Sequence, residues 1–170
     1  MSESTDAIHV LHVDDEPDFA DLVGTFLERE DDRITVHTVT NPSDVVNVVA
    51  DHDIDCIVSD YNMAGMNGIE FLERVREIHP DIPFILFTGR GSEEVASDAI
   101  TAGATDYLQK GGETEQYTIL ANRLQNAVAQ SRAQRRADEH KRITDVIRNL
   151  NRALVHADEV KEIEDEVCTI

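Results

Sequence analysis

Short apolar runs alternate with longer stretches of helical period along most of this chain, and this alternation constrains its fold more than any other feature. Runs of a few apolar residues bounded by turn residues predict buried strands. Right-handed crossovers between such strands place helices on both faces of a parallel sheet. The sequence therefore predicts an α/β fold built from five β-α units. The predicted strands are residues 8–13, 34–36, 56–59, 84–87 and 106–109.

The stretches between the predicted strands carry the signals of helices. Pro17 suits the first turn of one helix, and Asn41 followed by Pro42 predicts the start of a second. Each helix has an apolar stripe that is expected to pack on the sheet. The third and fourth helices are expected over residues 67–79 and 92–102. The apolar stripe of the first helix is Phe19, Leu22, Val23, Phe26 and Leu27, and that of the second is Val45, Val46, Val48 and Val49. The apolar stripe of the third helix is Phe71, Leu72, Val75 and Ile78.

Polar residues follow four of the predicted strands. Because ligands of parallel α/β sheets bind at the carboxyl ends of the strands, these residues are expected to converge at one edge. Converging carboxylates repel each other unless a cation lies between them, and Mg²⁺ is the hard, oxygen-seeking cation that suits them. The residues are Asp14, Asp15 and Glu16 after the first strand, Asp60, Tyr61 and Asn62 after the third, Thr88 and Gly89 after the fourth, and Lys110 and Gly111 after the fifth.

Asp60 is the candidate nucleophile of this set. A carboxylate can attack phosphorus once a metal ion and fixed donors neutralise the phosphoryl oxygens. Thr88 offers a hydroxyl donor and Lys110 a cation on a flexible stem. Lysine is scarce in this chain, which makes Lys110 at the end of a strand informative. The set therefore predicts phosphoryl transfer to an aspartate.

These residues resemble the response regulator receiver family, to which chemotaxis response regulators belong, over roughly residues 7–128. The resemblance implies a doubly wound, five-stranded, flavodoxin-like (βα)5 sheet. It also implies two-component signal transduction with a histidine kinase as phosphodonor. The implied catalytic residues are Asp60, which is the phosphoacceptor, together with Thr88, Lys110 and Asp14. The implied Mg²⁺ ligands are Asp15, Asp60 and the backbone carbonyl of Asn62, with Asp14 acting through water, and the implied switch residues are Thr88 and Tyr107.

Two positions depart from the family pattern. Ala64 stands where the family commonly has proline after the phosphorylated strand, and Gly111 stands where Lys-Pro is usual. The family's Lys-Pro bond is typically cis, whereas a cis bond before a residue other than proline costs about 3 kcal/mol. We therefore expect a trans Lys110–Gly111 peptide, in which glycine's freedom re-aims the lysine.

Other interpretations stay open from the sequence. In so acidic a chain an Asp pair can serve only solubility, Thr88 could hydrogen-bond a turn, and Tyr107 could be an ordinary strand aromatic. A Mg²⁺-dependent phosphohydrolase is a second function, although haloacid dehalogenase-like enzymes carry Asp-x-Asp after the first strand and this chain does not. A phosphorylation-independent interaction or dimerisation module is a third. Under the receiver interpretation the chain is no enzyme beyond its own phosphotransfer and dephosphorylation.

The histidines and cysteines give no signal of a site. The two cysteines, Cys56 and Cys168, offer neither a disulfide framework nor the spacing of metal ligands. The histidines also lack the i, i+4 spacing of metal ligands, so spacing alone predicts no metal role for them. Those considered are His9, His12, His37, His52 and His79.

Composition limits the partners and the location. The net charge of −20, from 35 acidic and 15 basic residues, repels nucleic acid. No apolar stretch approaches the length of a membrane span and the start is unlike a signal peptide, so a cytoplasmic protein is expected. Abundant Asp with scarce Lys resembles proteins of high-salt cytoplasm, which suggests a halophilic archaeon as the source.

Residues 129–170 are predicted to form a helical linker. Its first part is polar, and a helical break is expected at Ala157 and Asp158. The apolar stripe between them can pair with a second copy as a coiled-coil homodimer, or pack back on the same chain. The segment weakly resembles the helical entry to a GAF or PAS-type sensory domain, so we expect it to lead to an output domain that is missing or truncated here. The stripe is Ile143, Val146, Ile147, Leu150, Leu154 and Val155.

Overall fold

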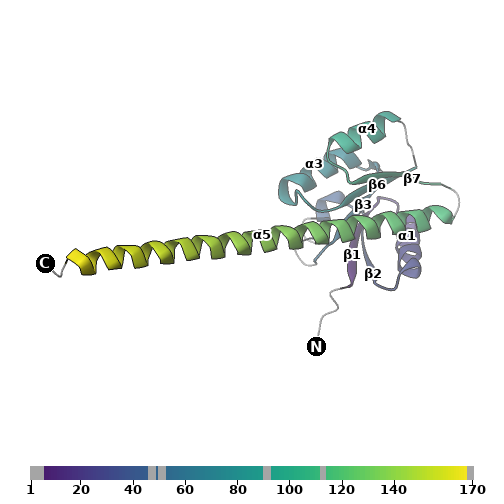
Figure 1. The fold of residues 1–170 in the computed structure, drawn as a ribbon. Coiled ribbons are helices and arrows are strands. Elements are labelled where there is room, and N and C mark those ends of the chain that lie inside the picture. Colours follow the sequence, from purple (N-terminus) through teal and green to yellow (C-terminus); the bar gives the residue numbers. More distant parts are fainter. Residues whose placement is uncertain (1–5, 46–48, 50–52, 90–92, 112–113, 168–170) are drawn as a thin grey trace. The chain divides into compact units, whose positions relative to one another are not determined.

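The computed structural model describes residues 6–45, 49, 53–89, 93–111 and 114–167, with side chains as far as residue 152 (Figure 1). The chain divides into two compact units, Met1–Ser131 and Arg132–Ile170. The first unit holds the sheet and all the predicted site residues. Some residues used in the sequence predictions lie outside the described ranges, namely Val46, Val48, His52, Ser92 and Cys168.

A five-stranded parallel sheet forms the centre of the first unit. Its order is β2-β1-β3-β6-β7, so the chain winds outward in both directions from the first strand. The predicted doubly wound α/β fold is confirmed, and two strands run further than expected, β2 to Val39 and β6 to Thr88. The strands are β1 Ile8–Val13, β2 Ile34–Val39, β3 Cys56–Ser59, β6 Phe84–Thr88 and β7 Asp106–Gln109.

Local signals set the ends of the helices. Asn67 caps α3 with a capping box, in which its side chain accepts from the backbone N–H of Glu70 and Glu70 reaches back to the N–H of Asn67. Gly103, with φ +97°, lies just beyond α4, where glycine tolerates the left-handed backbone. The helices are α1 Pro17–Glu30, the 3₁₀ turn η1 Pro42–Asp44, α3 Gly68–Ile78, α4 Glu93–Thr101 and α5 Glu115–Val167.

The helices cover both faces of the sheet and form two apolar layers (Figure 1). On one face α1 and the first turns of α5 pack through residues such as Leu27 and Leu124. On the other face α3 and α4 pack through residues such as Leu72 and Ala99. Since each strand alternates its side chains between these layers, the carboxyl edge of the sheet is left for the polar residues that follow the strands.

The loop after β3 forms a small hairpin that no pattern in the sequence predicts. β4, Asn62–Met63, pairs antiparallel with β5, Met66–Asn67. The turn contains Gly65 at φ +84°, a value that favours glycine. Two-residue strands leave no periodic signal, which is why the hairpin was missed.

Three expectations from the sequence were wrong. Leu22 is 44 % exposed, because the buried face of α1 is centred on Ala20, Val23, Gly24 and Leu27. Ile78 is 58 % exposed, because it is the last residue of α3. The helical break expected at residues 157–158 does not occur, since α5 continues to Val167, and neither Ala nor Asp prevents a helix.

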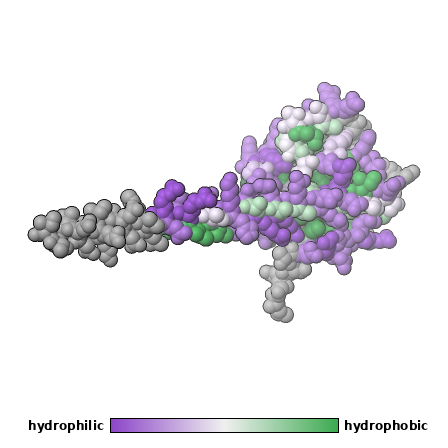
Figure 2. Space-filling model, in the orientation of Figure 1, coloured by the Kyte–Doolittle hydropathy of each residue, from purple (hydrophilic) through white to green (hydrophobic). Residues whose placement is uncertain are grey.

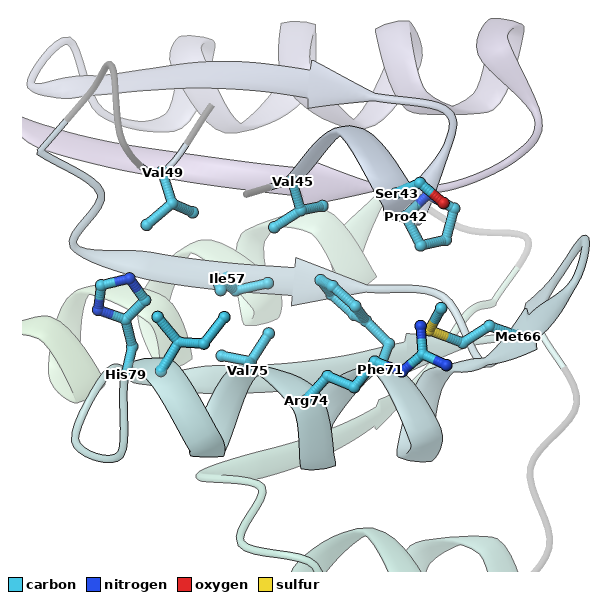
Figure 3. Close-up of a pocket in the computed structure, with 11 residues that line it drawn as sticks. Pro42, Ser43, Val45, Val49, Ile57, Met66, Phe71, Arg74, Val75 and His79 are labelled. Atoms are coloured by element: carbon cyan, nitrogen blue, oxygen red, sulfur yellow. The ribbon is translucent and has the colours of Figure 1, made fainter. Parts of the chain in front are cut away.

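A cavity of about 520 Å³ lies on the α3 face of the sheet, between α3 and the segment around η1 (Figure 3). Its walls are mostly apolar, with Val45 and Val49 facing Phe71 and Val75 across Ile57. None of the predicted site residues lines it. The cavity is therefore separate from the carboxyl edge where the polar residues gather.

The second unit is the continuation of α5 from Arg132. Four apolar side chains on it, at i, i+3, i+4 and i+7, are 51–58 % exposed. Figure 2 shows apolar surface beside strongly hydrophilic surface on this helix. Within the described ranges no helix is both long and apolar enough to cross a membrane. The four residues are Ile143, Val146, Ile147 and Leu150.

Candidate functional site

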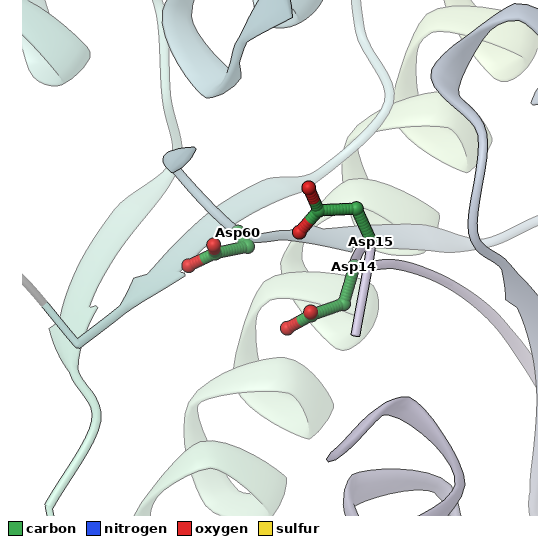
Figure 4. Close-up of side chains that lie close together, drawn as sticks. All are labelled: Asp14, Asp15 and Asp60. Atoms are coloured by element: carbon green, nitrogen blue, oxygen red, sulfur yellow. The ribbon is translucent and has the colours of Figure 1, made fainter. Parts of the chain in front are cut away.

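Three carboxylates converge at the carboxyl edge of the sheet, where the sequence placed them. Asp14 and Asp15 follow β1, Asp60 follows β3, and one oxygen from each lies within 4.8 Å of the others (Figure 4). Asp14 and Asp60 are buried, and Asp15 is half-buried. Among the described residues this is the one group of three or more acidic, His or Cys side chains close enough to share a metal ion.

The two carboxylate oxygens of Asp60 have different surroundings. Oδ2 accepts a hydrogen bond from the backbone N–H of Asn62 at 3.2 Å. Oδ1 is buried and lies 3.1 Å from Nζ of Lys110, but no well-aligned hydrogen bond reaches it from the part of the chain described. A buried carboxylate oxygen without a hydrogen bond is costly, and a cation or an added group would satisfy it.

The acidic pair after β1 is held by backbone donors. Oδ1 of Asp14 accepts from the N–H of Glu16 at 3.0 Å. Oδ2 of Asp15 accepts from the N–H of Ala64 at 2.9 Å. A proline at position 64 has no N–H to donate, so this departure from the family pattern adds a bond between the β4-β5 hairpin and Asp15.

Lys110 joins the two buried carboxylates. Its Nζ lies 2.7 Å from Oδ2 of Asp14 and 3.1 Å from Oδ1 of Asp60. No cis peptide occurs among the described residues, so the Lys110–Gly111 bond is trans, as expected from the glycine. The lysine therefore reaches the site without the cis bond that is typical of the family.

The aromatic ring of Phe19 on α1 contacts the ammonium of Lys110. The Lys110 ammonium lies 4.1 Å from the centroid of the Phe19 ring, a cation-π distance. The sequence pattern places Phe19 only in the apolar stripe of α1. Helical periodicity indicates which face meets the sheet, but it cannot indicate which side chain of another element lies above that face.

Thr88 and Tyr107 lie on the neighbouring strands β6 and β7. Thr88 is fully buried at the end of β6, and its backbone carbonyl accepts from the N–H of Lys110 at 2.7 Å. Tyr107 is half-buried against the α3-α4 layer, its hydroxyl has no hydrogen-bond partner in the described ranges, and burial raises its pKa. The structure thus places Thr88 at the same edge as the acids and Tyr107 just before it.

Two further residues, His12 and Gly68, lie against the site. Neither was predicted from the sequence to be a site residue. His12, on β1, is fully buried, and burial together with the charge of Lys110 lowers its pKa to about 4. Gly68, the first residue of α3, lies so close to the backbone carbonyl of Asp60 that a Cβ there would overlap it, and the same Cβ would lie 2.7 Å from Cδ1 of Leu86. No sequence pattern signals either contact.

A doubly wound sheet with an acidic cluster, a threonine and a lysine at its carboxyl edge is the arrangement of a receiver domain. The family profile described as "Response regulator receiver domain" matches residues 10–122. The chain therefore belongs to the response regulator receiver family of two-component systems.

Among curated proteins, the response regulator SaeR of Staphylococcus aureus is 33 % identical over 116 residues, which are 68 % of this chain and 50 % of SaeR. This chain thus spans about half the length of that relative. Among solved structures, the chemotaxis response regulator CheY4 of Vibrio cholerae is 27 % identical with a TM-score of 0.61, over 69 % of this chain and 98 % of CheY4. A receiver domain from Clostridium thermocellum has the same fold, at 23 % identity, TM-score 0.66, and coverage of 74 % and 98 %.

Proposed function

We propose that this receiver accepts a phosphoryl group on Asp60 from a histidine kinase, with Mg²⁺ bound at the acidic cluster, and later loses the group to water. Under this proposal the chain performs only its own phosphotransfer and dephosphorylation and does not turn over a separate substrate. The observation that carries the proposal is Oδ1 of Asp60. This oxygen is buried, lacks a well-formed hydrogen bond and lies 3.1 Å from Lys110.

The donor set at this edge suits Mg²⁺. Mg²⁺ prefers oxygen ligands and keeps several waters, and the carboxylate oxygens of Asp14, Asp15 and Asp60 lie within 4.8 Å of one another. Asp15 and Asp60 are the proposed direct ligands, joined by the backbone carbonyl of Asn62, with Asp14 acting through a water. When bound, the ion would neutralise charge on the phosphoryl oxygens.

The residues of the chain have separate roles in the transfer. An oxygen of Asp60 attacks phosphorus, so a new O–P bond forms while the bond between phosphorus and the donor atom breaks and its electron pair leaves with the donor. Lys110 binds a phosphoryl oxygen with its ammonium, and the Thr88 hydroxyl donates to another. Hydrolysis reverses the modification when water attacks the acyl phosphate and Asp60 leaves as carboxylate.

A mass measurement tests the proposal. The protein is incubated with Mg²⁺ and acetyl phosphate in concentrated potassium chloride, with Asp60→Asn and the exposed Asp21→Asn as matched variants. We expect an acid-stable, base-labile gain of one phosphoryl group in the wild type and in Asp21→Asn, and none in Asp60→Asn. A gain that persists in Asp60→Asn would place the phosphoryl group elsewhere and overturn the assignment.

Two other functions predict different results. A phosphohydrolase would turn over a small phosphate ester without accumulating a phosphorylated aspartate. A phosphorylation-independent interaction module would gain no phosphoryl group, and its Asp60→Asn variant would associate as the wild type does. The glycine at position 111 leaves the interaction module open as a function. The contacts of the Lys110 ammonium with Asp14 at 2.7 Å and with Asp60 at 3.1 Å favour the receiver chemistry instead.

We further propose that two copies pair through the exposed stripe on α5. Ile143, Val146, Ile147 and Leu150 follow the spacing of a helical seam and are 51–58 % exposed. The net charge of −20 opposes contacts with nucleic acid phosphates, so a protein partner is favoured over DNA or RNA, and the cytoplasm is the proposed location.

A further inference from the structure

Two histidines that are far apart in sequence meet on the sheet. His9 on β1 and His37 on the neighbouring edge strand β2 are both half-buried. Nδ1 of His9 lies 3.3 Å from Nε2 of His37, and the rings meet edge to edge with these nitrogens facing each other, since the centroids are 5.6 Å apart and the planes are inclined at 27°. The parallel register pairs Leu11 with His37, so the two imidazoles meet on a diagonal.

The separation of the two nitrogens matches a metal chelate. Zn²⁺ binds imidazole nitrogen at 2.0–2.1 Å with tetrahedral angles, which places two nitrogen ligands about 3.3 Å apart. A direct hydrogen bond between the rings has a similar length, and it requires one ring to be neutral. Two neutral imidazoles at this distance can therefore share either a proton or a cation.

We propose that His9 and His37 form a two-histidine chelate for an imidazole-preferring transition-metal cation such as Zn²⁺, with water in the remaining positions. Asp55 lies beside the pair, since its carboxylate accepts from the N–H of His9 at 3.0 Å, and it adds negative charge that favours a cation. This inference does not depend on phosphoryl transfer to Asp60.

The chelate and the acidic cluster would select different cations. The cluster of Asp14, Asp15 and Asp60 offers only carboxylate oxygens, which suit Mg²⁺, whereas imidazole nitrogen suits zinc, copper and nickel. A cation bridging His9 and His37 would tie the edge strand β2 to β1. Because the unfolded chain does not hold the two rings together, binding would stabilise the folded state.

Calorimetric titration with Zn²⁺ tests the proposal. Millimolar Mg²⁺ is present throughout to occupy the carboxylates, and the proteins are wild type, His9→Gln, His37→Gln and Asp60→Asn, with His140→Gln as a control on an exposed face of α5. We expect one Zn²⁺ site that weakens at least tenfold in each of His9→Gln and His37→Gln. The same site should be unchanged in Asp60→Asn and His140→Gln.

A second measurement guards against variants that fail to fold. In the wild-type protein, ¹⁵N shifts of the histidine rings are followed during the titration. Two rings should shift together at one equivalent of Zn²⁺, and the melting temperature should rise only in proteins that keep both histidines. An unchanged Zn²⁺ isotherm in folded His9→Gln and His37→Gln would overturn the proposal, and so would a wild-type titration in which no pair of rings shifts.

Discussion

At the scale of single residues, the lysine of the site is held by one aromatic ring and two carboxylates. The Lys110 ammonium lies 4.1 Å from the Phe19 ring and 2.7 Å from Asp14. The peptide bond between Lys110 and Gly111 is trans, so the backbone of Lys110 lacks the cis bond that is typical of the family. We infer that Phe19 positions the lysine for the phosphoryl group.

Replacing Phe19 therefore tests a positioning role. A partly buried cation-π contact is worth about 1 kcal/mol, so Phe19→Leu should slow phosphorylation by acetyl phosphate about fivefold. Phe19→Tyr keeps the ring and should restore the rate. In a double-mutant cycle the effect of Phe19→Leu should vanish in a Lys110→Met background. An equal slowing in that background would mean that Phe19 acts through packing alone.

His12 makes the stability of the protein depend on pH. Burial and the charge of Lys110 lower its pKa to about 4, against 6.5 for an unperturbed histidine. Between these values the unfolded chain binds a proton that the folded chain does not, so stability falls as pH drops through this window. We expect His12 to lower the free energy of unfolding by about 2 kcal/mol between pH 7 and pH 5. Denaturant unfolding at the two pH values measures this loss.

The matched variant is His12→Leu, which cannot take up a proton. Its loss of stability from pH 7 to pH 5 should be smaller than that of the wild type by about the same 2 kcal/mol. Parallel losses in the two proteins would show that His12 ionises as easily when folded as when unfolded.

At the scale of elements, α3 begins beside Asp60 and is stabilised by its N-terminal cap. The Asn67 side chain accepts from the N–H groups of Ile69 and Glu70, both at 2.9 Å. Asn67→Ala should lower the free energy of unfolding by about 1 kcal/mol, and Asn67→Ser should recover most of it. Denaturant unfolding measures both variants. Equal stability of the Ala and Ser variants would rule out a capping contribution.

The elements that were predictable from the sequence are those with a periodic pattern or a punctuating residue. Apolar runs located all five strands of the sheet, and strand topology then brought Asp14, Asp60 and Lys110 to one edge. Contacts between elements were not predictable in this way. The pairing of His9 with His37 depends on strand register, which separation along the chain does not reveal.

At the scale of the whole molecule, α5 contributes to both units of the chain. Its first turns bury Tyr117, Leu120 and Leu124 in the first unit. Beyond Arg132 its apolar side chains are exposed, as in the stripe that begins at Ile143. The apolar side chains at the start of this helix are therefore buried against the sheet, whereas those of the stripe are the ones proposed to pair with a second copy.

Oligomeric state tests the role of this stripe. Ile147→Asp places a charge in the proposed seam and should shift the protein from dimer to monomer in sedimentation equilibrium. Asn149→Asp introduces the same charge off the stripe and should leave the dimer intact. A wild-type protein that is monomeric at all concentrations would refute pairing through α5.

The contact of Gly68 with Asp60 has a consequence for how variation at this site is interpreted. Position 68 has no side chain and performs no chemistry, yet the Asp60 carbonyl, Tyr61 and Leu86 leave no space for even a methyl group. In a library of substitutions we therefore expect position 68 to tolerate as few replacements as Asp60. The failure of substitutions at position 68 would result from the close approach of the α3 backbone to the backbone of Asp60. The structure shows this cause, whereas the substitution data alone would also fit a catalytic role.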